Sequence, residues 1–338
     1  MSYADIDLNG KTVLITGGAG FIGSNLALHI EQQYPACRVV VFDAFVLGHF
    51  RNLRGFRGEC LAGDIAVAKD LEQLTSYRFD AIFHQAAISD TTVGDQQRMV
   101  QVNTNAFRRL LDLAASMSAP VVYASSAGVY GNSPAPHRVG CGEEPENVYG
   151  FSKLMMDHAA RQYARSHEIK LVGLRYFNVY GPRESYKGRM ASMILQLGLQ
   201  LLSGQRPRLF KFGGQKRDFV FVEDVVQANL RALTAQQSGV YNVGSGRARE
   251  FRELLEILQR VLGTQQEVAW IDNPWEFYQD HTEADIAETM TKLGYAPRFT
   301  LEAGIESYAA EIRRLAKPLS PPSTPDSNPL GAVPPTPP

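Results

Sequence analysis

Two side chains four residues apart, Tyr149 and Lys153, have the types and spacing of an acid–base pair. Residues i and i+4 lie on one face of a helix, so the phenol and the ammonium group can point into the same site. A nearby cation stabilises a phenolate and lowers the pKa of a tyrosine from about 10. Tyr149 would then take a proton from a substrate hydroxyl near neutral pH. Ser126 lies upstream, just past the end of an expected strand, where its hydroxyl would orient the substrate oxygen.

A glycine-rich turn, GGAGFIG at residues 17–23, supplies a second pattern. Gly17 and Gly20 let the backbone approach a pyrophosphate, and Gly23 lets the next helix pack close to the preceding strand. The free N–H groups and positive dipole at the start of that helix favour phosphate. Asp43 follows Gly23 by twenty residues, at the end of the next expected strand, where a carboxylate binds ribose hydroxyls. The spacing predicts a dinucleotide site, and an oxidised nicotinamide there would add positive charge near Tyr149 and accept a hydride.

These side chains need a scaffold, and the pattern from Lys11 onward alternates β-branched runs with helical stretches. Such alternation predicts a parallel sheet with crossover helices. Strands are expected at residues 12–16, 38–42, 81–84, 121–124 and 171–174, because each is an apolar run bracketed by polar residues. Helices are expected after the glycine turn, at residues 103–117 and from about Tyr149. The predicted fold class is a Rossmann-type, doubly wound α/β sheet.

The pattern changes after residue 177, where a helix at 190–202, a strand at 218–222 and an amphipathic helix at 251–262 are expected. We predict an NAD(P)-binding domain over residues 1–177, with later segments crossing back to it. Residues 178–316 are predicted to form mainly a smaller, mixed α/β substrate-binding lobe. Residues 317–338 are rich in proline, serine and threonine, which predicts a disordered tail.

Together, the glycine turn, Ser126, Tyr149 and Lys153 resemble the extended short-chain dehydrogenases/reductases, which include the NAD-dependent epimerases and dehydratases. The resemblance implies further cofactor contacts from Phe21, Ile22, Ala44, Asp64, Ile65, Gln85, Ala86, Ala87, Ser89, Asn103, Lys153 and Val179. It also implies NADP as the cofactor. Asp43 favours NAD instead, and only His49, Arg51 or Arg54 follow closely enough to reach a 2′-phosphate.

Two positions argue against one branch of this family. The similar 4,6-dehydratases carry an Asp-Glu pair just after the serine/threonine position, as the acid for water elimination. Ala127 and Gly128 stand there in this sequence. Dehydration is therefore not expected, and epimerisation or oxidation remains.

Residues 175–192, RYFNVYGPRESYKGRMAS, resemble more narrowly the ADP-L-glycero-D-manno-heptose 6-epimerases of lipopolysaccharide biosynthesis. Residues 90–92, 217–220 and 241–244 support this resemblance. It implies an isomerase that inverts C6 of an ADP-heptose through a transient ketone and re-reduction. Lys187 matches the family's second acid–base group, with phosphate binding as the alternative role.

Substrate contacts are implied at Thr91, Asn178, Arg189, Gln196, Phe210, Arg217 and Tyr278. Arg217 could grip the diphosphate as a bidentate fork. Gln196 and Arg189 depart from the family, where histidine and serine are common.

The composition excludes several other classes. The formal net charge is −1, so no basic field indicates nucleic acid as a partner. Three separated cysteines form no metal or disulfide pattern, and no apolar run reaches the length of a membrane span. We therefore expect a soluble cytoplasmic enzyme without a metal, and the family resemblance implies a homo-oligomer.

Three alternatives stay open. The chain could be a 4-epimerase of UDP- or GDP-hexoses, although the segment after residue 184 argues against it. It could be a non-catalytic NAD(P)-binding sensor, although such proteins typically lose the tyrosine or the lysine. The proline-rich tail could also make it an interaction adaptor.

Overall fold

A seven-stranded parallel sheet forms the larger part of the computed structural model, which describes residues 6–273 and 279–317. The strand order is β10-β6-β5-β4-β1-β2-β3. The bounds are β1 Thr12–Thr16, β2 Arg38–Asp43, β3 Glu59–Ala62, β4 Ala81–His84, β5 Val121–Ser126, β6 Leu171–Tyr176 and β10 Gly239–Val243. From β1 the successive strands β2 and β3 are added on one side and β4, β5 and β6 on the other, so the strand order reverses between β1 and β4, as in a doubly wound fold.

Helices cover both faces of this sheet. Successive side chains of each buried strand point to opposite faces, so each strand contributes to two cores. In β1, Val13 and Ile15 pack in one core with α1 (Phe21–Gln33) and α7 (Val222–Ala232), whereas Leu14 packs in another. That second core contains α4 (Ala106–Ser116) and α5 (Val148–Ser166). The continuous apolar runs of the strands are therefore explained by burial on two sides.

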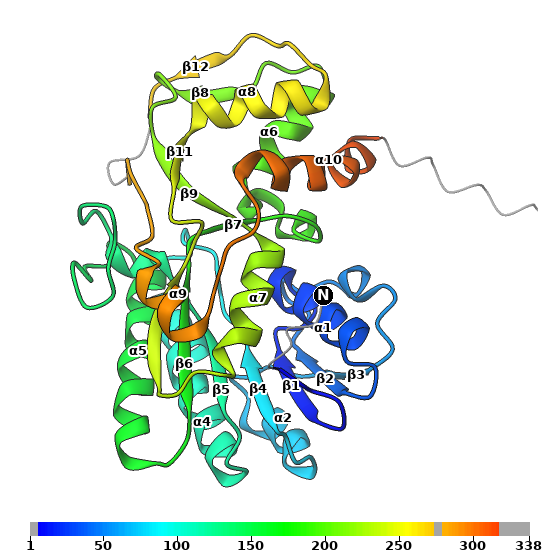
Figure 1. The fold of residues 1–338 in the computed structure, drawn as a ribbon, viewed down its shortest axis with the longest axis vertical. Helices are drawn as coiled ribbons and strands as arrows, with labels where there is room; N and C mark the ends of the chain where they lie inside the picture. Colours follow the sequence, from blue (N-terminus) through cyan, green and yellow to red (C-terminus); the bar gives the residue numbers. More distant parts are fainter. Residues whose placement is uncertain (1–5, 274–278, 318–338) are drawn as a thin grey trace, which may run out of the picture.

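A smaller region lies at one end of the large sheet (Figure 1) and has its own core. It contains the sheet β11-β9-β7 and the pair β12-β8. Their bounds are β7 Asn178–Tyr180, β8 Arg208–Phe210, β9 Lys216–Phe221, β11 Ala248–Glu250 and β12 Ala269–Ile271. Helices α6 (Met193–Leu202), α8 (Phe251–Leu262) and α10 (Leu301–Ala316) pack against one another there. Leucines and isoleucines from these three helices supply most of that core.

The remaining elements are short and lie in the segments between these strands and helices. They are the α-helices α2 (Ala68–Glu72), α3 (Gln96–Val100) and α9 (Ala287–Leu293), a π-turn at Gln101–Asn105, and 3₁₀ turns at Phe50–Leu53, Gln73–Ser76, Ala127–Tyr130 and Ser185–Met190. Strand β10 and helix α7, both beyond residue 177, pack with the large sheet.

Several elements differ from the sequence prediction. β3 was not predicted, because this short edge strand alternates partly buried and exposed residues. The expected helix at 103–117 starts earlier, with α3, and passes through the π-turn before α4. α6 begins at Met193 rather than at 190, because the hydroxyl of Ser192 accepts the backbone N–H of Leu195 and caps the helix. The expected strand at 218–222 is β9, which starts two residues earlier. The predicted tail from 318 onward lies outside the described residues.

Candidate active site

The glycine turn connects β1 to α1 and leaves the N-terminus of that helix without a cap. The N-cap residue Gly20 makes no side-chain hydrogen bond, and the first turn of α1 holds no acidic residue. Gly17 has a φ of +69°, and a Cβ there would meet the backbone nitrogen of Ala86 at 2.6 Å. Glycine alone tolerates both conditions, so the turn lies close against the segment after β4. The first N–H groups of α1 have no partner within the helix, which suits them to a pyrophosphate.

A cavity of about 580 Å³ lies along the carboxyl ends of the central strands. The predicted site residues that line it are Gly17, Gly20, Phe21, Ile22, Gly23, Asp43, Ala44, Asp64, Ile65, Gln85, Ala86, Ala87, Ser89, Ser126, Tyr149, Lys153, Val179, Lys187 and Arg189. The cavity thus brings the glycine turn, the predicted acid–base pair and both basic residues of the 185–190 segment into one space.

At one end of this cavity, the carboxylate of Asp43 is nearly buried, with 7% of the residue exposed. Its oxygens accept the backbone N–H groups of Ala19 at 2.9 Å and Phe45 at 2.7 Å. Burial raises the pKa of Asp43, and these two hydrogen bonds oppose that rise. The wall beside it contains Ala44, Val46 and Leu47.

The middle of the cavity is lined by residues that follow β4 and end β6. The amide of Gln85 donates to Oδ1 of Asn229 at 3.0 Å, and the hydroxyl of Tyr176 donates to the same oxygen at 3.0 Å. Burial raises the pKa of Tyr176, so its phenol stays protonated. These contacts hold the cavity wall against α7, which carries Asn229.

Ser126 ends β5 and Tyr149 lies in the first turn of α5, and both line the cavity. The hydroxyl oxygen of Ser126 accepts the backbone N–H of Gly128 at 3.1 Å. Burial raises the pKa of Tyr149 above its ordinary value, and a hydrogen bond with Ser126 acts in the opposite direction. Lowering that pKa toward neutrality therefore requires additional positive charge, as expected from an oxidised nicotinamide.

Lys153 lies one turn further along α5 and is 1% exposed. Its Nζ donates to the carbonyl oxygen of Ala124 at 2.8 Å and lies 5.8 Å from the ring centroid of Tyr149. Burial lowers the pKa of Lys153 to about 8, whereas the charge of Asp157 raises it. The ammonium group is thus fixed beside Tyr149 and is only moderately basic.

Lys187 reaches the same cavity from the 3₁₀ turn Ser185–Met190. Its Nζ lies 5.5 Å from the ring centroid of Phe21, in the first turn of α1. Burial lowers the pKa of Lys187, and the neighbouring charge of Glu184 opposes that effect. Glu184 is fully buried and accepts hydrogen bonds from the backbone N–H and hydroxyl of Ser192, at 2.6 and 2.7 Å, which fixes the segment that carries Lys187.

The remaining predicted residues do not line this cavity. Asn103 lies behind its wall, where it donates to the hydroxyl of Ser152 at 2.9 Å and accepts the backbone N–H of Ile88 at 2.8 Å. The predicted substrate-binding residues outside the cavity lining are Thr91, Asn178, Gln196, Phe210 and Arg217. Tyr278 lies outside the described residues.

Two of these predicted substrate-binding residues, Gln196 and Arg217, make contacts within the protein. The amide of Gln196 donates to the carbonyl oxygens of Arg189 and Ala191, at 3.2 and 2.6 Å, and so supports the segment that carries Arg189. Arg217 lies in β9, is 8% exposed, and donates to the carbonyl oxygen of Lys216 at 2.8 Å. Their contacts with a substrate stay predictions.

The cavity also contains residues that the sequence did not single out. Val46 and Leu47 follow β2, and Tyr176 ends β6. Their positions at the carboxyl ends of strands could have marked them as cavity residues, because ligands of open α/β sheets bind beyond those ends. Arg98 also lines the cavity, and its Nη2 lies 3.0 Å from an oxygen of Asp64.

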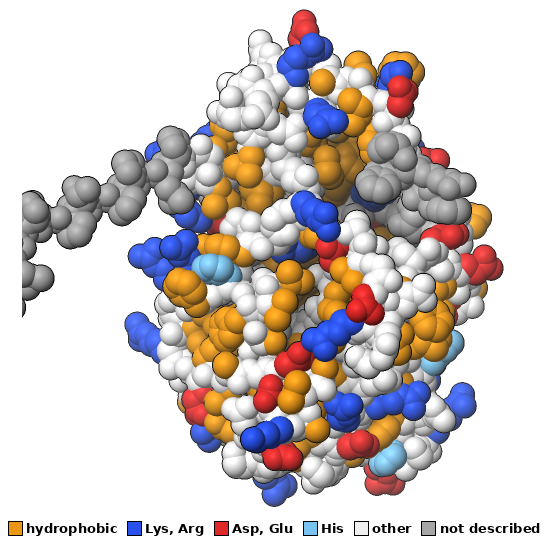
Figure 2. All heavy atoms as spheres, turned by 180° about the vertical axis from the view of Figure 1, so that it is seen from behind, with side chains coloured by type: hydrophobic (Ala, Val, Ile, Leu, Met, Phe, Trp, Pro, Cys, Tyr) orange, Lys and Arg blue, Asp and Glu red, His pale blue; other side chains and the backbone are white. Residues whose placement is uncertain are grey.

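Basic and acidic side chains are interspersed over the face shown in Figure 2, in keeping with the net charge of −1. Within residues 6–273 and 279–317 no helix is long and apolar enough to cross a membrane. In the same residues, no group of three histidines, cysteines or acidic side chains is placed to hold a metal ion.

Comparison with known proteins gives consistent matches. The model of the NAD dependent epimerase/dehydratase family matches residues 13–244. The ADP-L-glycero-D-manno-heptose-6-epimerase of Pseudomonas paraeruginosa is 36% identical over 337 residues, which cover 90% of this chain and 100% of that protein.

Solved structures give the same picture. The crystal structure of the Helicobacter pylori ADP-L-glycero-D-manno-heptose-6-epimerase is 51% identical, with a TM-score of 0.87 over 92% of this chain and 99% of that chain. The UDP-glucose 4-epimerase of Thermotoga maritima, solved with UDP-glucose, is 27% identical, with a TM-score of 0.84 over 90% of this chain and 100% of that chain.

Proposed function

This chain belongs to the NAD-dependent epimerase/dehydratase family, and from that premise we propose that it converts ADP-D-glycero-D-manno-heptose into ADP-L-glycero-D-manno-heptose by inverting C6. The observation that carries this proposal is one cavity lined by Ser126, Tyr149, Lys153 and Lys187 together with the start of α1. Two heptose epimerases similar to the chain over about nine tenths of its length support the choice of sugar. The enzyme is an isomerase whose product serves lipopolysaccharide core synthesis.

The cavity fits a nicotinamide dinucleotide. The uncapped start of α1 suits the pyrophosphate, and the close approach of Gly17 to Ala86 leaves room there for no side chain. Asp43 at the end of β2 suits a ribose. When bound, the nicotinamide supplies the acceptor and donor of a hydride.

The residues of the chain handle the proton. Tyr149 takes the proton of the C6 hydroxyl in this proposal and Ser126 binds the same oxygen, which is supported by the fact that both side chains line the cavity. Lys153 keeps a positive charge beside the phenol, because its Nζ is fixed on the carbonyl oxygen of Ala124. The half-reaction leaves a ketone at C6, which must present its other face before reduction inverts the centre.

Inversion requires a proton donor and acceptor that can serve the second face. We assign this role to Lys187, because it enters the cavity from a different segment than Tyr149. If Lys187 is an acid–base group, Lys187→Met lowers kcat with little change in KM. If it only binds phosphate, KM rises and kcat is kept. Lys187→Arg is the matched variant, since it keeps the charge but holds its proton at all relevant pH values.

We further propose that the chain prefers NADP to NAD. A preference for NADP requires a positively charged side chain near the 2′-phosphate. We assign this role to Arg51 or Arg54, which follow the cavity wall beside Asp43 in the sequence but do not line the cavity. Cofactor released from purified protein identifies the resident dinucleotide. If Arg51→Ala and Arg54→Ala both leave the NADP content unchanged, this assignment is wrong.

A second candidate is a UDP-hexose 4-epimerase, favoured by the similarity to the Thermotoga maritima enzyme. Incubation with UDP-galactose distinguishes the two, since only a 4-epimerase forms UDP-glucose. A sensor without catalysis is disfavoured because Tyr149 and Lys153 are both in place. Removal of residues 318–338 tests the adaptor role, and we expect full activity without them.

The direct test is an NMR assay of purified protein with ADP-D-glycero-D-manno-heptose and no added cofactor. We expect an equilibrium mixture of the two C6 epimers. If neither retained nor added NADP or NAD gives conversion, the heptose proposal is wrong. Cytoplasmic location and homo-oligomeric assembly stay predictions, and sedimentation analysis of the purified protein tests the latter.

A further inference from the structure

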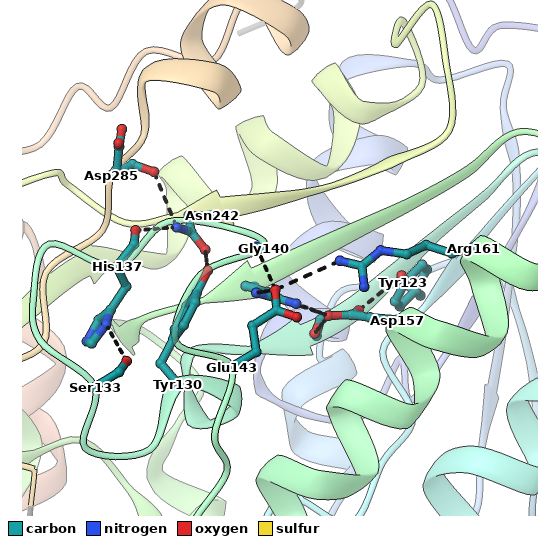
Figure 3. A network of polar contacts seen from close by, with 12 residues as sticks. Tyr123, Tyr130, Ser133, His137, Gly140, Glu143, Asp157, Arg161, Asn242 and Asp285 are labelled. Carbon is teal, nitrogen blue, oxygen red and sulfur yellow. Dashed lines mark hydrogen bonds and ion pairs between the residues drawn. The ribbon is translucent and has the colours of Figure 1, made fainter.

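A buried carboxylate lies two turns after Tyr149 and one turn after Lys153 on α5. Asp157 is completely buried, and its oxygens accept four hydrogen bonds from two neighbouring strands. The hydroxyls of Tyr123 and Ser125, both on β5, donate at 3.0 and 3.1 Å. Nε and Nη2 of Arg175, on β6, donate at 2.9 and 2.8 Å. Figure 3 shows Asp157 pointing from α5 toward Tyr123.

The guanidinium of Arg175 is itself enclosed and doubly paired. The residue is 0% exposed, and its Nη1 lies 2.6 Å from an oxygen of Glu143. Glu143 belongs to the loop between β5 and α5, and it also lies 3.9 Å from Arg161 of α5 (Figure 3). Arg175 further stands 5.0 Å from the ring centroid of Tyr130. A single buried cation therefore joins the helix, the sheet and the loop.

The segment of β5 held by Asp157 is the segment on which the site depends. Ala124 accepts the hydrogen bond of Lys153, Ser125 donates to Asp157, and Ser126 lines the cavity. Buried ion pairs contribute little net stability, because desolvation offsets attraction. Their directional hydrogen bonds do fix geometry, and catalytic groups must be held to within about 0.5 Å.

We propose that Asp157 is a positioning residue for the epimerisation: it locks α5, which carries Tyr149 and Lys153, onto the end of β5, which carries Ser126. The inference rests on the proposed function. Asp157 acts through its contacts with β5 and Arg175, and it does not line the cavity.

Asp157 also influences the charge of Lys153. The titratable groups that contact or influence Lys153 are Tyr149 and Asp157 on α5 and His84 on β4. Arg175 on β6 pairs with both Asp157 and Glu143. Burial lowers the pKa of His84 to about 3, so it is neutral. Asp157 is the group whose charge raises the pKa of Lys153, so its neutralisation shifts that pKa further down.

The test compares Asp157→Asn with Ser125→Ala in steady-state epimerisation across pH. Asp157→Asn keeps the shape but removes the charge. We expect kcat to fall about 10–100-fold with KM nearly unchanged, because displaced catalytic groups lose that much rate. The alkaline limb of the kcat profile should also move to lower pH. Ser125→Ala should lower kcat by a smaller factor without moving the limb, because it removes one contact and no charge.

Asp112→Asn is the matched control. Asp112, an exposed residue of α4, accepts a hydrogen bond from Tyr163 of α5 at 3.0 Å and lies away from the Asp157 cluster, so kcat should be unchanged. Titration of the Tyr149 phenolate, from the ultraviolet difference against Tyr149→Phe, gives a readout independent of turnover. In protein with oxidised cofactor bound, which lowers the pKa of Tyr149 toward that of Lys153, the Tyr149 pKa should rise in Asp157→Asn, because Lys153 loses its charge at a lower pH.

Two results overturn the inference. One is a folded Asp157→Asn enzyme with the kcat and alkaline limb of the unaltered protein. If this variant does not fold, the double variant Tyr123→Phe with Ser125→Ala keeps the ion pair and must still lower kcat, so full activity of that variant also refutes it. Absence of epimerisation in the unaltered protein would instead refute the proposed function.

Discussion

Replacing Lys153 by methionine should stabilise the protein near neutral pH while it abolishes turnover. The side chain is 1% exposed, and burial lowers its pKa from 10.5 to about 8. A shift of that size means that the charged form costs roughly 3.4 kcal/mol in the folded protein, at about 1.36 kcal/mol per unit. Methionine has a similar length and no charge, so the variant avoids this cost.

The loss of one hydrogen bond reduces this gain in stability. Nζ of Lys153 donates to the carbonyl oxygen of Ala124, and methionine leaves that oxygen without this donor. An unpaired buried acceptor costs about 1–3 kcal/mol. The free energy of unfolding at pH 7 should therefore rise by about 1–2 kcal/mol.

The pH dependence of the free energy of unfolding measures the cost of burying the Lys153 charge separately from the hydrogen bond to Ala124. The pKa of Lys153 is lower in the folded than in the unfolded protein, so the unfolded chain binds more protons between about pH 8 and 10.5. Stability from this group therefore rises with pH across that window. From pH 7 to 9 the unaltered protein should gain about 1.3 kcal/mol relative to Lys153→Met.

Urea unfolding of both proteins at pH 7 and 9, together with kcat, is the assay. Lys153→Met should be inactive and more stable at pH 7, and the difference should shrink at pH 9. If the variant is less stable at pH 7 and the difference does not change with pH, then burial of this ammonium carries no cost and the reasoning is refuted.

Three further outcomes are expected. Tyr149→Phe should lower kcat by at least about 10²-fold, the range of acid–base contributions, while retained cofactor in the purified protein is unchanged; a fully active variant would exclude Tyr149 as the base. Gly17→Ala should lose bound cofactor, because φ is +69° and its Cβ would meet the nitrogen of Ala86 at 2.6 Å; unchanged cofactor content would contradict this. His84 is buried with a pKa lowered to about 3, so the unfolded chain binds more protons at acid pH, and stability should fall by about 2 kcal/mol from pH 7 to 5. In His84→Asn that fall should be smaller by the same amount, measured by urea unfolding; an equal fall would place the acid sensitivity elsewhere.

The sequence was sufficient where local chemistry decides structure. The glycine turn requires a positive φ at Gly17 and a close approach to Ala86, so its residue types are informative without a structure. The helix Phe251–Leu262 matched its prediction because its apolar spacing is regular and Gly263 ends it with a φ of +70°. Strands β1 and β4 matched their predictions because both are buried on two faces, which gives each a continuous apolar run.

The parts that were missed depend on contacts distant in sequence. β3 lies at the sheet edge, where one face is exposed and the apolar run is broken. The four hydrogen bonds of Asp157 join residues that are 18 to 34 positions apart, and no local pattern marks such a cluster. The place of Gln196 against the backbone of Arg189 and Ala191 likewise follows from tertiary packing.

The most direct test of the account uses ADP-D-glycero-D-manno-heptose with deuterium at C6, followed by NMR in ordinary water. We predict an inverted product that keeps its deuterium at C6, because the hydride removed from that carbon returns to the same carbon. Inversion with loss of deuterium to solvent would mean that C6 is deprotonated instead, and would contradict the oxidation–reduction mechanism at this site.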